Sequence, residues 1–295
     1  MATAAPTVTP PRDGPTLGHV PDTVRQALLL SRYQFRDYLR ARRFILMMAI
    51  VGVIGGILTF VLSYFHDSST VQGLVSSSNA FYGSLWAGGV GVVIVFSGII
   101  FGGDAIAGEF QNKTGYFLMG LPIRRASVYV GKFLAAFAAS LVAVVVYLAI
   151  LLANGAYYLG GNALPLALGE SFAISLLYLL ALLGAVFLFS SMFKNSLYAV
   201  LVVAVLFLFG FTLIQAVVTD LAKVEPWFLI TYAENVISYP FLSMPPSHEL
   251  TVTGPRGFTA TTYNATYPEG FAIMVGYFLV SAVAGLFFFE REEFK

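Results

Sequence analysis

Six stretches of the chain are long and apolar enough to cross a membrane as helices. The hydrocarbon core of a bilayer is about 30 Å thick, and a helix needs roughly 20 residues to span it. None of the six carries Asp, Glu, Lys or Arg, and none shows the two-residue alternation of a β-barrel strand. The pattern predicts an all-α integral membrane protein with six transmembrane helices at 44–65, 81–102, 133–159, 172–193, 197–218 and 271–289.

Lys and Arg are unevenly distributed over the connections between these spans. They gather before span one, between spans two and three, in the turn between spans four and five, and at the C-terminus, whereas 66–80 and 160–171 have none. Cytoplasmic flanks hold the excess of positive charge, so both termini are predicted to be cytoplasmic, in a multi-pass protein of the cell membrane. Lys223 and Arg256 lie on the predicted outer side, in a loop that is long enough to escape this rule.

The segment before the first span divides into a tail and a helix. Residues 1–20 are rich in Pro, Thr and Ala and lack the apolar core of a signal peptide, which predicts a disordered cytoplasmic tail. Residues 21–43 place apolar side chains and arginines on different faces, with Asp22 as a cap. We expect an amphipathic helix in the plane of the inner leaflet, and a simple basic anchor is the alternative.

Residues 44–295 then form one six-span domain, in which the connection 219–270 is the largest extracellular loop. Its first half is apolar and its second half is polar and rich in Thr and Gly, which predicts a short helix or re-entrant hairpin followed by an outer lobe. The triplet at Asn264 is an N-glycosylation acceptor on the predicted outer side. The same pattern at Asn112 lies on the predicted cytoplasmic side, so the triplet alone is weakly specific.

Small residues recur in the first two spans. Gly52 and Gly56 form a GxxxG pattern in span one, which allows a second helix to approach closely. We expect this face to pack within the bundle, with a subunit interface as the alternative.

Patterns that carry catalysis or bind metals are missing from the sequence. No two intramembrane aspartates and no Ser–His pair at membrane depth are available for a protease. With no cysteine there are no disulfides and no thiolate sites. The three histidines, His19, His66 and His248, lie in the tail and the outer loops without metal-ligand spacing. We therefore expect no catalytic residue, no metal site and no enzyme activity on this chain.

The composition, with 58% hydrophobic and 11% charged residues among 295 and a mean hydropathy of +0.81, leaves no room for a soluble nucleotide-binding domain. The sequence has no GxxxxGK[ST] loop for ATP. The spans also lack the acidic and basic groups of a proton or sodium relay. If ATP drives the protein, a separate chain must hydrolyse it.

One strip, residues 108–133, reads GEFQNKTGYFLMGLPIRRASVYVGKF and gathers charge, aromatics, glycines and a proline on the predicted cytoplasmic side. Glu109 and Lys113 are i, i+4 partners in the order that favours a helix. Phe110 and Phe117 lie on one side of that helix.

Pro122 ends this helix, and Arg124 and Arg125 follow the break before Lys132 reaches the mouth of span three. The layout predicts a short cytoplasmic helix, a break, a basic corner and then a second helix within the segment 103–132. The alternative is a loop that binds lipid headgroups.

At these residues the sequence resembles ABC-2 type permeases, the membrane subunits of ABC exporters. The family carries a Glu, a nearby Gly/Thr pair, a Leu-rich step, Pro-x-x-Arg and Gly-Lys after its second span. The matching positions are Glu109, Thr114 with Gly115, 118–121, Pro122 to Arg125, and Gly131 with Lys132. The Thr and Gly stand in reversed order here, which leaves the subfamily open.

The resemblance implies that the strip is a coupling helix seated in a groove of a partner P-loop ATPase, braced by the N-terminal helix. ATP and Mg would then bind the partner, and this chain would hold no cofactor. The implied ATPase-coupling residues are Glu109, Phe110, Lys113, Phe117, Pro122, Arg124 and Arg125.

The family also works as two permeases in the lipid membrane, here expected to be a homodimer, with no nucleic acid as partner. Spans two and five usually line its route, which points to Trp86, Phe96, Phe207, Phe209 and Phe211. We expect a permease subunit that exports an amphiphilic, lipid-like or peptide substrate. A non-transporting assembly subunit and an ATP-independent channel or scramblase are the alternatives.

Overall fold

The computed structural model describes residues 22–112, 123–160, 164–253 and 259–291. The predicted tail 1–20 and three predicted coupling residues, Lys113, Phe117 and Pro122, lie outside this part of the chain.

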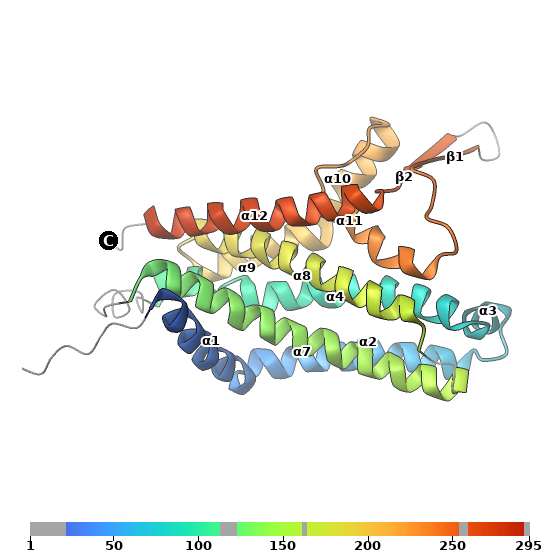
Figure 1. Ribbon diagram of the computed structural model, residues 1–295, viewed down its shortest axis with the longest axis horizontal. Coiled ribbons are helices and arrows are strands. Elements are labelled where there is room, and N and C mark those ends of the chain that lie inside the picture. The colour runs from blue at the N-terminus through green and yellow to red at the C-terminus, as the bar shows by residue number, and fades with distance from the viewer. Residues whose placement is uncertain (1–21, 113–122, 161–163, 254–258, 292–295) are drawn as a thin grey trace, which may run out of the picture.

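Six helices in the described part of the chain are long and apolar enough to span a membrane, which confirms the predicted helical membrane fold (Figure 1). Span five combines regular helix with two wide π-helical turns. The spans are α2 (Arg42–Tyr64), α4 (Ser78–Gly102) with α5 (Ala107–Gln111), α7 (Arg125–Leu159), α8 (Leu166–Met192), the run α9 (Ser196–Val205), η2 (Leu206–Gly210), α10 (Phe211–Ala216) and η3 (Val217–Leu221), and α12 (Tyr267–Arg291).

Spans two and four form the centre of the bundle. In the most hydrophobic window of each, 78% of span two and 61% of span four is buried, against 17% of spans five and six. Trp86 of α4 donates a hydrogen bond to Ser171 of α8 at 3.0 Å and stacks on Tyr147 of α7. The outer faces of spans one, five and six are therefore the surfaces left for lipid or for another subunit.

The helix before the first span is α1 (Thr23–Arg40). Asp22 is its N-cap residue, as predicted, and its carboxylate accepts a hydrogen bond from Thr23 N at 2.8 Å. The chain turns at Ala41, and α1 runs at an angle to the spans and packs against the first turns of α7 (Figure 1). Its position in the membrane plane stays a prediction.

Span three differs most from its predicted bounds, because α7 begins at Arg125 instead of residue 133. The helix predicted after the basic corner is continuous with span three, and its residues Ser127, Val128 and Tyr129 are buried. The helix thus reaches about two turns beyond the predicted span.

The GxxxG face of span one is not packed within the bundle, so the expectation for it was wrong. A methyl group added at Gly52 or Gly56 would meet no atom within 4 Å, whereas one at Gly55 would lie 2.8 Å from Ile150. Gly55, one position away from Gly56, supplies the close approach to α7.

The outer connections carry the remaining elements. They are α3 (Ser69–Val75), α11 (Ile230–Glu234), the 3₁₀ helix η4 (Asn235–Phe241) and an antiparallel hairpin of β1 (Glu249–Thr253) and β2 (Thr259–Tyr263), in which Glu249 pairs with Tyr263. The short helices α11 and η4 pack against α4, α8 and α12. Their buried side chains include Ile230, Tyr232 and Val236.

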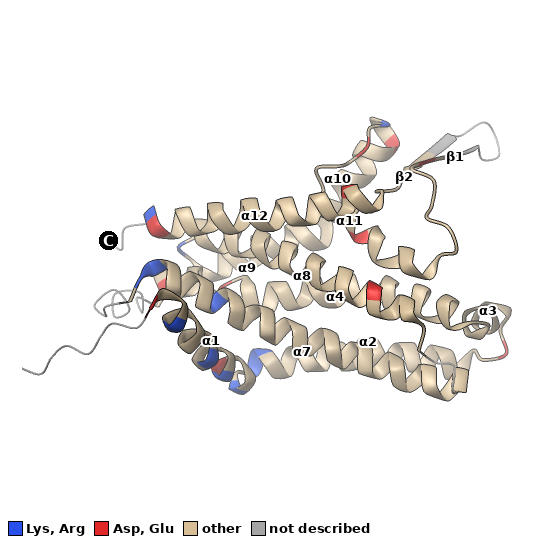
Figure 2. Ribbon diagram, viewed as in Figure 1, with Lys and Arg blue, Asp and Glu red and all other residues tan. Residues whose placement is uncertain are grey.

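Lys and Arg concentrate at one end of the bundle, on α1, at the starts of α2 and α7, and at the end of α12 (Figure 2). Lys223 lies in the connection between spans five and six, where its carbonyl oxygen accepts a hydrogen bond from the Tyr263 hydroxyl at 2.8 Å. This segregation is the spatial form of the charge pattern on which the predicted orientation rests.

Two glycines of α12 give a matched test of the packing against α8. A methyl group at Gly285 would overlap Tyr129 Oη and lie 3.2 Å from Leu188 Cα, whereas one at Gly276 would meet nothing within 4 Å. We expect G285A to lower the thermal unfolding midpoint in detergent, at a cost of about 1–3 kcal/mol. G276A should leave the midpoint unchanged or raise it, because Ala favours helix. Equal midpoints for the two variants would contradict this packing.

Candidate functional site

The most constrained part of the Lys- and Arg-rich end of the bundle is the turn Gly103–Ile106, which separates α4 from α5. A Cβ atom at position 103 would lie 2.6 Å from the Ile99 carbonyl oxygen, a backbone atom that cannot move aside. Glycine is therefore required where the helix breaks. The turn is also buried, since Ala105 and Ile106 are 5% and 0% exposed.

Ser190 of α8 satisfies the backbone donors that the break leaves open. Its hydroxyl oxygen accepts hydrogen bonds from Ile106 N at 3.1 Å and from Ala107 N at 3.2 Å. This is an N-terminal cap for α5 supplied by another span, where local capping residues usually serve. The start of α5 is thereby tied to span four.

Two side chains from other helices satisfy the carbonyls around the break. Lys132 of α7 donates from Nζ to the Ala105 oxygen at 2.9 Å, and Tyr38 of α1 donates from Oη to the Phe101 oxygen at 3.0 Å. Burial raises the pKa of the Tyr38 hydroxyl well above its ordinary value, and the charge of Asp104 adds to this effect. Tyr38 therefore stays protonated and keeps donating.

Two ion pairs complete the junction. Lys132 Nζ lies 2.5 Å from Glu109 Oε1, and the two side chains are only 7% and 17% exposed. Arg43 Nη1 lies 2.8 Å from Asp104 Oδ1, in a more exposed position. We call the set Tyr38, Arg43, Asp104, Glu109, Lys132 and Ser190 the junction. It joins α1, α2, α7 and α8 to the turn and to α5.

The start of α7 is also joined to α1. Ser127 Oγ donates to the Thr23 carbonyl at 3.1 Å, and Arg124 N donates to Gln26 Oε1 at 3.3 Å. The helices cross at Gly131, where a Cβ atom would lie 2.9 Å from the Ala27 carbonyl oxygen. The glycine of the Gly131–Lys132 dipeptide thus permits this close crossing, and its lysine enters the junction.

Four of the predicted coupling residues lie in the described part of the chain. Glu109 belongs to the junction, and the Phe110 ring packs inward, with its centroid 6.1 Å from that of Phe289. Arg124 precedes the first residue of α7, and Arg125 Nη1 donates to the Glu290 carbonyl at 2.7 Å. Their contact with an ATPase stays a prediction.

The five aromatics predicted to line a route are not brought together in the single chain. Trp86 is fully buried in the core, and Phe207, 4% exposed, packs edge-on against Phe211. Phe96 is partly buried, whereas Phe209 is 68% exposed. A lining role for them stays a prediction, and for the exposed Phe209 it depends on a second subunit.

Sequence reasoning missed Glu234, which the fold carries from the outer connection into the bundle. Tyr178 of α8 donates to Glu234 Oε2 at 2.9 Å, and the carboxylate fills the space above Gly91 of α4. Burial raises the pKa of this carboxyl above its ordinary value. The available signal was a single acid within the apolar run PWFLITYAENVISYPF.

The predicted glycosylation residue, Asn264, lies beside the β hairpin. Its side-chain amide donates to the Ser247 carbonyl at 3.0 Å. Modification of this residue stays a prediction.

Comparison with known proteins gives one finding. A sequence model of the family described as "ABC-2 family transporter protein" matches residues 28–294, nearly the whole chain. No curated protein matches the chain.

The buried pair of the junction makes a stability prediction. In K132M the Glu109 carboxylate and the Ala105 carbonyl lose their buried partner, so unfolding in detergent should become easier by about 3–5 kcal/mol. The double variant E109Q/K132M also removes the carboxylate charge that faces Lys132 and should recover part of this loss. R32M, at an exposed arginine of α1, serves as the control. An unfolding midpoint of K132M equal to that of R32M would refute the pairing.

Proposed function

Because the chain belongs to the ABC-2 transporter family, we propose that it is the permease subunit of an exporter that a separate cytoplasmic P-loop ATPase drives. The observation that carries this proposal is the junction described above. It ties α5, the described start of the predicted coupling segment, to helices on three sides.

The connections of α5 explain how an external push would reach the spans. Its Glu109 is held by Lys132 of span three, and its first N–H groups are held by Ser190 of span four. At its other end, Gln111 Oε1 accepts a hydrogen bond from Ser196 N at 2.7 Å, at the start of span five. Movement of α5 therefore acts on three spans at once, as ATP-driven closure of two partner ATPases requires.

The surfaces that the bundle leaves open suit a second permease copy within the lipid membrane. Gly52 and Gly56 present a face of span one with no neighbour in the described chain. Span five is among the least buried spans and exposes Phe209. We place the twofold contact of a homodimer on these two spans, since small residues let membrane helices approach closely.

The cargo that fits this subunit is amphiphilic, such as a lipid-like molecule or a hydrophobic peptide. The faces of the spans are apolar and aromatic, without the charged groups that a hydrophilic ion would need. Export follows from the family resemblance. Nucleotide and Mg²⁺ are assigned to the ATPase partner, and no chemistry is assigned to this chain.

Charge reversal at the corner after the coupling segment tests the proposal. In R124E/R125E, acidic side chains replace the basic corner that we place against the ATPase, and like-charge contacts at an interface cost several kcal/mol. We expect ATP-dependent transport in proteoliposomes to fall by at least about tenfold. Insertion into the membrane should be unchanged, because both residues precede the spanning part of α7.

The matched control is R32E/R36E, which makes the same charge change at exposed positions of α1. Transport by R124E/R125E at the control rate would refute the coupling role. Transport without ATP would favour the channel or scramblase. ATPase binding without any transport by the unmodified chain would favour an assembly subunit.

The orientation can be tested directly because the chain has no native cysteine. We propose that α1 is cytoplasmic and the connection after α2 is external. A single cysteine at Asp67, whose side chain is 88% exposed, should react with a membrane-impermeant maleimide in intact cells. A single cysteine at Arg36 should react only after permeabilisation. Labelling of both in intact cells, or the reverse pattern, would refute this orientation.

A further inference from the structure

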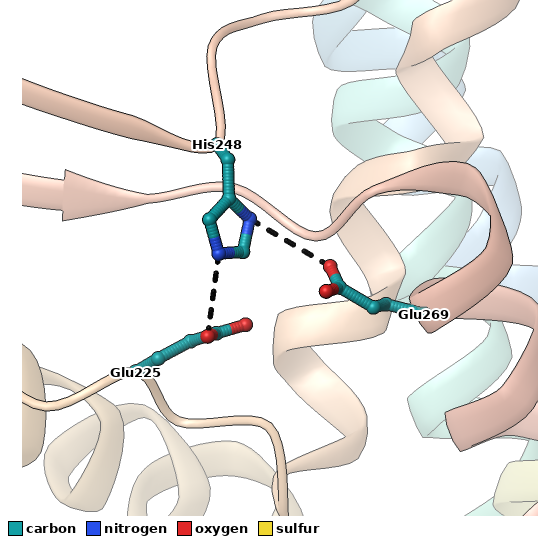
Figure 3. A group of neighbouring side chains, drawn as sticks. All are labelled: Glu225, His248 and Glu269. Carbon is teal, nitrogen blue, oxygen red and sulfur yellow. Dashed lines mark ion pairs between the residues drawn. The ribbon is translucent and has the colours of Figure 1, made fainter.

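Three segments that are distant in the sequence bring a histidine and two glutamates together in the outer lobe (Figure 3). Glu225 follows span five, His248 immediately precedes β1, and Glu269 lies in the first turn of α12. His248 Nε2 lies 3.4 Å from Glu225 Oε2, and His248 Nδ1 lies 3.7 Å from Glu269 Oε2. One ligand atom from each residue lies within 4.8 Å of the other two.

Each of the three side chains is held by a further hydrogen bond. Glu225 Oε1 accepts from the hydroxyl of Tyr232, a fully buried residue, at 2.7 Å. Glu269 Oε2 accepts from Thr266 N at 2.8 Å. Supporting bonds of this kind fix the ligands of metal sites before the ion binds.

The ring of His248 is oriented for ligation. Its Nδ1 lies 3.0 Å from the Asn264 carbonyl oxygen, which can only accept a hydrogen bond. The proton of the neutral ring is therefore on Nδ1, and the lone pair on Nε2 points toward Glu225. A backbone carbonyl that holds the other ring N–H is the usual arrangement of a metal-bound histidine.

Charge favours a cation at this place. Among the described residues, the ion pairs formed by Glu225 and Glu269 are both with His248. With a neutral ring, the cluster carries two negative charges. The three side chains remain reachable from solvent, with exposures of 26%, 44% and 43% for Glu225, His248 and Glu269.

We propose that Glu225, His248 and Glu269 bind one Zn²⁺ ion in the outer lobe. One nitrogen and two carboxylate oxygens, with water in the fourth position, form a ligand set that zinc accepts. Zn–ligand distances are about 2.0–2.2 Å. Binding at Nε2 therefore requires Glu225 to move closer and Glu269, which faces Nδ1, to turn toward Nε2. The ion cross-links the loop after span five, the β hairpin and the start of span six. This assignment is independent of the proposed transport function.

The first measurement is zinc content after dialysis of the full-length protein in detergent against a zinc buffer. We expect one zinc per chain, and a rise in the unfolding midpoint with Zn²⁺ that Mg²⁺ does not produce. Substitution of a ligand in H248A or E225Q should weaken zinc binding by at least about tenfold. H66A is the matched control, because His66 also lies in an outer connection beside one carboxylate, that of Asp67.

A second variant keeps the test decisive if H248A does not fold. H248C places a single thiol in a chain without other cysteines. With Co²⁺ as the probe, it should show thiolate-to-metal charge-transfer absorption that the unmodified chain lacks. No bound zinc in the unmodified chain, equal zinc in H248A and H66A, or no such absorption in folded H248C would overturn the proposal. Stabilisation that depends on pH alone would show a histidine–carboxylate ion pair instead.

Discussion

A helix that breaks inside a membrane protein exposes backbone donors and acceptors where little water can reach them, and these groups need partners from elsewhere in the chain. The buried turn Gly103–Ile106 imposes this requirement at the Lys- and Arg-rich end of the bundle. Ser190 supplies the acceptor, and Lys132 and Tyr38 supply the donors. Since these side chains come from α8, α7 and α1, the positions of three helices depend on one break.

The lysine in this arrangement has an unusual position for a membrane helix. A lysine near a helix end usually extends to the lipid headgroups, but the Lys132 side chain is only 7% exposed and pairs with Glu109. Breaking a buried ion pair is costly, whereas its net contribution to stability is small. The Glu109–Lys132 pair is therefore better understood as fixing the register of α5 against α7.

The six spans could be predicted because membrane thickness sets their length and because charge is absent from them. The start of span three could not be predicted. The residues of its first turns resemble a polar connection in the sequence, and they are buried only because α1 packs against them. Gly52 and Gly56 were misassigned because a GxxxG pattern shows that a second helix can approach closely, but it does not show which helix does so. Glu234 and the cluster around His248 were missed for another reason. Their partners are far away in the sequence, so no short motif indicates these contacts.

Span five connects the two ends of the molecule on which the proposals rest. The backbone N–H of its first residue, Ser196, donates a hydrogen bond to Gln111 of α5. Near its other end, Gln215 Oε1 accepts a hydrogen bond from the Thr231 hydroxyl of α11 at 2.8 Å. Between these ties the helix contains the wide turn η2 and is little buried. Wide turns interrupt the regular hydrogen-bond ladder and are places where helices bend. Span five is therefore hydrogen-bonded to other elements near both of its ends and can bend between them. It is thus less constrained by its neighbours than the packed spans two and four.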